Sequence, residues 1–169
     1  MKRNTVLMVS FCLCIVTSCV TSTSKKDLSV DDIKASILRH QQTIIDSITE
    51  HSGAGKRPGV AVLDIASGNN DLGVFATEEI ILQLVRTRRF RVVDRDSIET
   101  ILKEQNFQYS GVVSDETAVS IGKFIGASVI IKGMIHQRQK QFDFSLKILD
   151  VETAEIIDLI SIPIGIHQL

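Results

Sequence analysis

The spacing of apolar residues changes along this chain, and the change constrains the fold more than any other feature of the sequence. Between residues 29 and 50, isoleucines recur at helical spacing, at positions 33, 37, 44, 45 and 48. Between residues 142 and 148, apolar side chains instead alternate with polar ones, as in a strand with one buried face. A chain that uses both periods packs helices against a sheet, so we predict an α/β fold.

Buried strands and capped helices are expected between and after these two segments. The predicted strands lie at 59–65, 90–93, 127–134, 142–148 and 155–162. The predicted helices lie at 72–87, after a cap at Asp96, and after a cap at Ser114. Loops as short as those between the last three strands require antiparallel pairing. The predicted order is β-α-β-α-α followed by a three-strand antiparallel meander, in a mixed sheet covered by helices and preceded by the amphipathic helix.

The first residues of the chain are typical of an export signal. Two basic residues precede an apolar run over 5–16, which is shorter than the roughly 20 residues that a spanning helix needs. The tetrad at 16–19 resembles the lipobox of bacterial lipoproteins. This resemblance implies cleavage between Ser18 and Cys19 and a lipid on the Cys19 sulfur. An uncleaved anchor and a plain secretory signal are the alternatives.

These features predict four successive segments: a signal peptide over 1–18, a lipid-anchored tether over 19–28, the amphipathic helix over 29–50 and the α/β domain over 57–169. The helix stripe packs either on its own domain, which we favour, or on a neighbouring copy. By resemblance to Gram-negative lipoproteins, the absence of aspartate at Val20 favours the periplasmic side of the outer membrane. All three cysteines lie within the first 19 residues, so the mature chain has no thiol for a disulfide or zinc site. We expect no cofactor beyond the lipid on Cys19.

No catalytic constellation is visible in the sequence. The glycines at 53–55 lack the spacing of a phosphate-binding loop, and the four histidines lack metal-ligand spacing. Asp94 and Asp96 follow a predicted strand, where carboxylates often act in α/β enzymes, but a helix cap explains them better. We therefore expect neither an enzyme, nor a metal site, nor a small-molecule substrate.

Five arginines within ten residues are the strongest charge feature: Arg86, Arg88, Arg89, Arg91 and Arg95. Positive charge at a helix C-terminus is favourable by itself, so a solvated surface is the simpler interpretation. The alternative is a docking patch for an anionic lipid headgroup, cell-wall polymer or acidic protein. The net charge of −1 argues against a nucleic-acid partner.

Several short motifs, in order, resemble the CsgG/HfaB family of bacterial lipoproteins. They are the run at 90–95, Ile98, the run at 101–105, Ser110-Gly111, Ile121-Gly122 and the run at 126–133. The strand at 59–65 and the turn at 150–155 are similar too, so the resemblance covers about 57–164. It implies an envelope-facing α/β domain that binds or assembles rather than catalyses. The family includes the curli secretion pore and LpoB-type activators of peptidoglycan synthases.

The chain departs from the pore-forming members of that family. Only eight residues, 134–141, lie between Gly133 and Phe142, where a pore needs added spanning strands of about 9–11 residues each. We therefore predict a lipid-tethered periplasmic module that docks on or activates an envelope machine. The alternative is a ring-forming component of a curli-like secretion system, whose two complementary contacts would be the isoleucine stripe and the arginine patch.

Overall fold

The computed structural model describes residues 28–52, 57–104, 113–138 and 141–165. The elements in chain order are α1 (Val30–Ser52), β1 (Gly59–Val62), β2 (Ala66–Ser67), α2 (Asn70–Thr87), β3 (Arg91–Val92), α3 (Arg95–Glu104), α4 (Asp115–Ile125), β4 (Val129–Arg138), β5 (Gln141–Asp150) and β6 (Ile156–Ile164). The mixed α/β class and the N-terminal helix are therefore as predicted.

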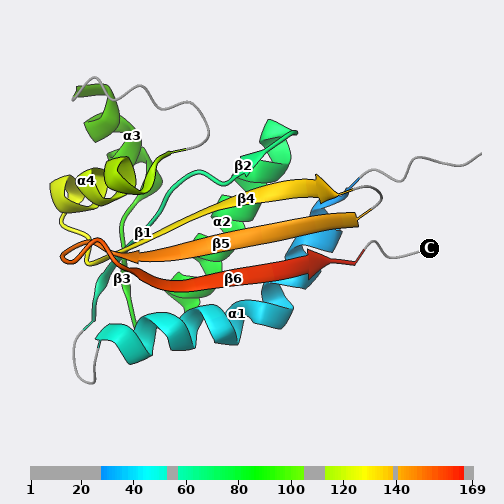
Figure 1. The fold of residues 1–169 in the computed structure, drawn as a ribbon, viewed down its shortest axis with the longest axis horizontal. Helices are drawn as coiled ribbons and strands as arrows, with labels where there is room; N and C mark the ends of the chain where they lie inside the picture. Colours follow the sequence, from blue (N-terminus) through cyan, green and yellow to red (C-terminus); the bar gives the residue numbers. More distant parts are fainter. Residues whose placement is uncertain (1–27, 53–56, 105–112, 139–140, 166–169) are drawn as a thin grey trace, which may run out of the picture.

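The strands form one mixed sheet in the order β3-β1-β4-β5-β6, and β2 pairs with the far part of β4. β1 runs parallel to both β3 and β4. β4, β5 and β6 form the predicted antiparallel meander, in which the long strands lie side by side (Figure 1). Their loops join adjacent strands directly, which is possible only for antiparallel neighbours.

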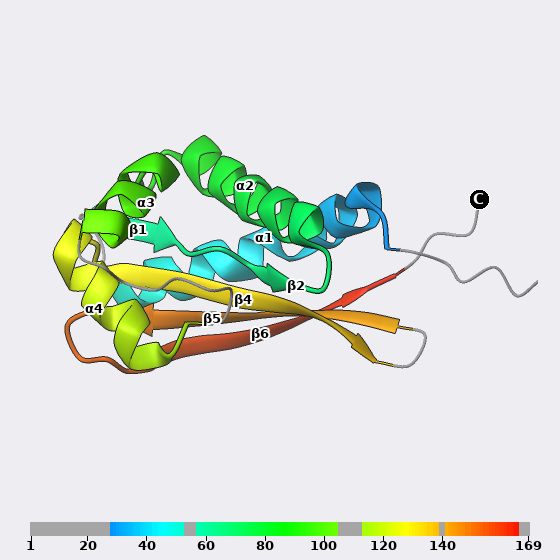
Figure 2. The ribbon, with the colours of Figure 1, turned by 90° about the horizontal axis from the view of Figure 1, so that it is seen from above.

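Helices α1 and α2 cover one face of the sheet (Figure 2). The isoleucine stripe of α1 is buried in one core cluster with apolar residues of α2 and of the strands. The stripe therefore packs on its own domain, as favoured from the sequence. Two polar contacts add to this packing: Ser47 Oγ donates to Asp158 at 2.5 Å, and His51 Nε2 lies 2.6 Å from Asp150 Oδ2.

Helices α3 and α4 cover only one end of the opposite face (Figure 1). Ile98 of α3 and Ile121 of α4 share a second apolar cluster with Ile130 and Leu149 of the sheet. The contact is close at Gly122, where an added Cβ would lie 2.6 Å from Val151 Cγ2. The rest of this face, farther along β4, β5 and β6, lies beyond the two helices.

The structure corrects three details of the prediction. Between the strand predicted at 59–65 and the helix predicted at 72–87, where no strand was predicted, Ala66 and Ser67 pair parallel with Met134 and Ile135 as β2. α2 begins at Asn70, after the cap Asn69, rather than at residue 72. The cap of α3 is Asp94 rather than Asp96, since Ser97 N donates to Asp94 Oδ2 at 3.1 Å.

Several predicted features lie outside the described residues. They include Ser18, Cys19, the whole signal and most of the tether, the glycines at 53–55 and the motif Ser110-Gly111. Within the ranges that are described, none of the helices combines the length and the hydropathy that crossing a membrane requires.

Candidate functional site

The part of the sheet that α3 and α4 leave uncovered presents three rows of side chains, one residue from each of β4, β5 and β6. Successive side chains of a strand point to opposite faces, so every second residue of these strands belongs to this surface. The rows are Lys132–Lys147–Leu159, Met134–Ser145–Ser161 and His136–Asp143–Pro163. We call this surface the open face.

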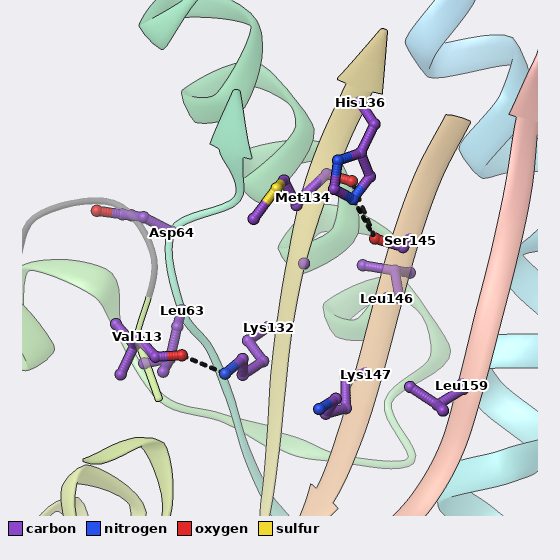
Figure 3. Close-up of a pocket in the computed structure, with 11 residues that line it drawn as sticks. Leu63, Asp64, Val113, Lys132, Met134, His136, Ser145, Leu146, Lys147 and Leu159 are labelled. Atoms are coloured by element: carbon purple, nitrogen blue, oxygen red, sulfur yellow. Dashed lines mark hydrogen bonds between the residues drawn. The ribbon is translucent and has the colours of Figure 1, made fainter. Parts of the chain in front are cut away.

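A cavity of about 160 Å³ lies on the open face, between the sheet and the segment that leads into α4. Its apolar lining includes Leu63, Met134 and Leu159, and its polar lining includes Lys132 and Ser145. Figure 3 shows Leu63 on the segment that follows β1, and the other four side chains on β4, β5 and β6. The cavity is far smaller than the 300 Å³ or more of an ordinary small-molecule pocket, which favours one inserted side chain over a substrate.

Two apolar residues of the edge strand β6 are exposed, and one of them, Leu159, lines the cavity. The side chain of Leu159 is 63% exposed and that of Ile156 is 48% exposed. Ile156 pairs with Leu149, whose side chain is on the α4 side of the sheet, so both exposed residues share one face. Apolar side chains next to charged ones are typical of protein–protein interfaces.

Two lysines and one carboxylate form the charged part of the open face. Ser114 caps α4 and places Asp115 in its first turn. Lys132 Nζ and Lys147 Nζ each lie 2.8 Å from an oxygen of Asp115, and Lys132 also donates to Val113 O. Hydrogen bonds from Lys132 and then Lys147 hold the pKa of the Asp115 carboxyl below its ordinary value. With both lysines charged, the cluster carries one net positive charge.

An acidic cluster lies at the other border of the cavity, around Arg95. Its Nε lies 3.1 Å from Asp64 Oδ1 and 3.7 Å from Glu99 Oε1, and its Nη1 lies 3.3 Å from Glu78 Oε1. Burial raises the pKa of the Asp64 carboxyl, although Arg95 opposes the rise. Three carboxylates around one guanidinium group give this border of the cavity a net negative charge, whereas the Asp115 cluster gives the other border a net positive charge.

His136 and Ser145 form a polar pair on the open face, with 3.3 Å between Nε2 and Oγ. Ser145 Oγ also donates to Met134 O, and the neighbouring Asp143 pairs with Arg138 instead of with the histidine. In a nucleophilic triad a carboxylate would orient the other imidazole nitrogen; no described residue does so here. The described ranges also contain no group of three His, Cys, Asp or Glu side chains suited to a metal ion.

The structure separates the five arginines predicted as a patch. Arg86, Arg88, Arg89 and Arg91 lie together, exposed, where α2 ends and β3 begins. Arg95 instead turns toward the acidic cluster described above. The other candidates, Ser18 and Cys19, lie outside the described residues.

Sequence reasoning missed the Asp115 cluster and the cavity beside it. The alternation over 142–148 did indicate that Lys147 shares a face with Asp143 and Ser145. The sequence held no signal for the pairing of Lys132 with Lys147, because cross-strand register decides it.

Comparisons with known proteins agree with this architecture. Residues 74–157 match the family model described as peptidoglycan-synthase activator LpoB. A search of curated proteins gave no match. The family match supports the LpoB-type branch of the resemblance noted from the sequence, and the CsgG/HfaB assignment itself is not shown.

Three solved structures have a similar fold. The LpoB C-terminal domain from Escherichia coli has a TM-score of 0.64 at 14% identity, over 79% of this chain and 98% of that one. The C-terminal domain from Salmonella enterica gives 0.55 at 15% identity, over 68% and 89%. The NMR structure of E. coli LpoB gives 0.57 at 17% identity, over 73% and 64%. The chain thus has the fold of the LpoB C-terminal domain, and over residues 74–157 it matches the peptidoglycan-synthase activator family.

Proposed function

We propose that this chain is a lipid-anchored activator that binds a peptidoglycan synthase in the periplasm and stimulates it. The observation that carries the proposal is the match of residues 74–157 to the LpoB family, on a fold shared with LpoB C-terminal domains. In this proposal the chain carries out no catalysis of its own, and the synthase performs the chemistry. The lipid on Cys19 holds the chain at the outer membrane, as the tetrad at 16–19 and Val20 suggest.

We assign the synthase contact to the open face. Leu159 and Ile156 supply exposed apolar area on an edge strand, and the Asp115 and Arg95 clusters border it with opposite charges. Apolar residues surrounded by charges give a protein interface both affinity and a fixed orientation. The small cavity beside Leu159 is suited to one side chain inserted by the partner.

The test is to replace Leu159 by glutamate and to measure binding to the peptidoglycan synthase of the same organism. We expect at least about tenfold weaker binding and a matching loss of stimulated glycan polymerisation, because a charge would enter the centre of the contact. Leu82→Glu is the matched control, since Leu82 is an exposed leucine of α2 on the other side of the sheet.

Two results would argue against this assignment. If the native protein neither binds nor stimulates the synthase, the proposed function is wrong. If Leu82→Glu weakens binding as much as Leu159→Glu does, the synthase contacts another face. Thermal unfolding of both variants shows whether each is folded.

A further inference from the structure

Five arginines gather at one end of the molecule without any acidic partner among the described residues. The group comprises Arg57, Arg86, Arg88, Arg89 and Arg91, which we call the arginine cluster. All five are exposed, and none forms an ion pair with a described residue. The whole chain has a net charge of −1, so this is a strong local concentration of positive charge.

Regular elements hold the arginine cluster in place. α2 ends at Thr87, and its C-cap Arg88 has a left-handed conformation, with φ of 57°, that turns the chain toward β3. The buried Phe90 fixes the next position, and Arg57 Nη2 donates to Phe90 O at 3.3 Å. Arg91 lies over Gly59, where an added Cβ would be 3.2 Å from its Nη2. The backbone that carries the arginines is therefore fixed, and the guanidinium groups of Arg57 and Arg91 lie against it, which lowers the entropic cost of binding.

The arginine cluster and the open face belong to different parts of the molecule. The cluster is built on the end of α2, on β3 and on the segment before β1, whereas the open face is built on β4, β5 and β6. β3 and β6 are the two opposite edges of the sheet. The two surfaces can therefore bind different partners at the same time.

The cluster is also remote from the start of the described domain. Figure 1 shows α1 beginning beside the C-terminal end of the described chain and ending on the side where α2 meets β3. A helix of 23 residues spans about 35 Å. The arginine cluster therefore lies about one helix length away from the residue at which the predicted tether joins the domain.

Guanidinium groups recognise planar oxyanions. Arginine binds carboxylates with two parallel hydrogen bonds, whereas lysine provides only a compact charge. Five arginines without carboxylate partners fit a polymer that repeats carboxylates along its length. Peptidoglycan is such a polymer, because its peptide stems carry free carboxylates.

We propose that the arginine cluster binds the carboxylates of the peptide stems of peptidoglycan. This proposal rests on the proposed function, which places the chain beside a synthase that makes this polymer. The open face holds the synthase, and the arginine cluster holds the wall into which its product is inserted. The chain thereby links the enzyme to existing peptidoglycan.

The experiment is co-sedimentation of the full-length lipoprotein, in detergent, with isolated peptidoglycan sacculi. The test variant carries Arg86→Gln, Arg88→Gln and Arg89→Gln, which removes three exposed charges and leaves Arg57 and Arg91 in place. We expect about tenfold weaker binding, and native binding that weakens as salt is added. The matched control carries Lys34→Gln, Lys103→Gln and Lys123→Gln, which removes the same charge from exposed sites elsewhere. It should bind like the native protein.

A second arm tests the chemistry of the ligand. We expect the native protein to bind much more weakly to sacculi whose carboxylates have been amidated. A variant with the three arginines replaced by lysine should retain part of the binding, because the charge remains while the paired hydrogen bonds are lost.

Three outcomes would overturn the proposal. In the first, the triple glutamine variant binds sacculi as tightly as the native protein does. In the second, the native protein binds amidated and untreated sacculi equally well. In the third outcome, the triple glutamine variant loses binding to the synthase and keeps binding to sacculi. The last outcome would move the cluster into the synthase interface. A native protein that binds sacculi without stimulating the synthase would support the cluster's role and refute the proposed function.

Discussion

Asp115 connects three segments of the chain through one carboxylate. It stands in the first turn of α4 and accepts hydrogen bonds from Lys132 of β4 and Lys147 of β5. Without this carboxylate the two lysines, which are direct neighbours across the strands, would repel each other. Asp115 therefore contributes to stability, and it does so only while it is ionised.

The pKa of Asp115 predicts how this contribution depends on pH. A carboxyl whose folded pKa lies below its unfolded value of 3.8 stabilises the fold above that value, and the contribution is lost as pH falls through the lowered pKa. We expect Asp115→Asn to lower the unfolding temperature near neutral pH, with a difference that vanishes in strong acid. Thermal unfolding across acidic pH measures this.

The control for this prediction is Glu152→Gln, an exposed residue of the turn between β5 and β6 that makes no ion pair with a described residue. It should leave the pH profile unchanged. A difference between Asp115→Asn and the native protein that persists at the lowest pH would show that shape, rather than charge, explains the effect.

The helix α1 is part of the core rather than an appendage. Its stripe lies in the same apolar cluster as Leu84 of α2 and Leu146 and Ile160 of the sheet. We expect Ile48→Ala, at a fully buried position, to reduce the free energy of unfolding by about 2–5 kcal/mol. Leu38→Ala, on the outer side of the same helix, should change it by about 0.5 kcal/mol or less. Chemical denaturation measures the free energy of unfolding of both variants. Equal losses in the two variants would contradict the burial of the isoleucine stripe in the core.

Long, periodic elements were predictable from the sequence, and short or non-local features were not. The isoleucine stripe of α1 extends over several helical turns, and the alternation in β5 extends over several residue pairs. Each apolar pattern therefore identified its element unambiguously. β2 has two residues, and its existence depends on pairing with β4 far along the chain. Asp94 and Asp96 are both acceptable caps, and only the backbone geometry distinguishes them.

The site was predictable only in part, for the same reason. Four arginines of the predicted patch lie within six residues of one another at a helix end, so they lie together in the fold. Arg95 lies apart from the other four arginines because its guanidinium group pairs with Asp64 and Glu78, which belong to other segments of the chain. The open face joins residues from three strands and one helix, which only the register brings together.

The surfaces of the molecule do not favour assembly into a closed ring. A ring needs two different complementary surfaces on each subunit, and one of the two candidates, the isoleucine stripe, is buried inside the domain. We expect a soluble form spanning 25–169 to be monomeric. Light scattering across a concentration series measures its mass. A closed oligomer of fixed, high stoichiometry would contradict this expectation and favour the secretion alternative.

The contact between α1 and β6 sets the order in which the domain can be completed. Ser47 of the first helix donates to Asp158 of the last strand, 111 residues away in sequence, and α1 shares its apolar cluster with β6. Contacts so distant in sequence form late and slow folding. In a chain that is synthesised from its N-terminus, the part of the isoleucine stripe that packs on β6 stays uncovered until the last strand is made. During this interval the incomplete domain is vulnerable to aggregation and proteolysis.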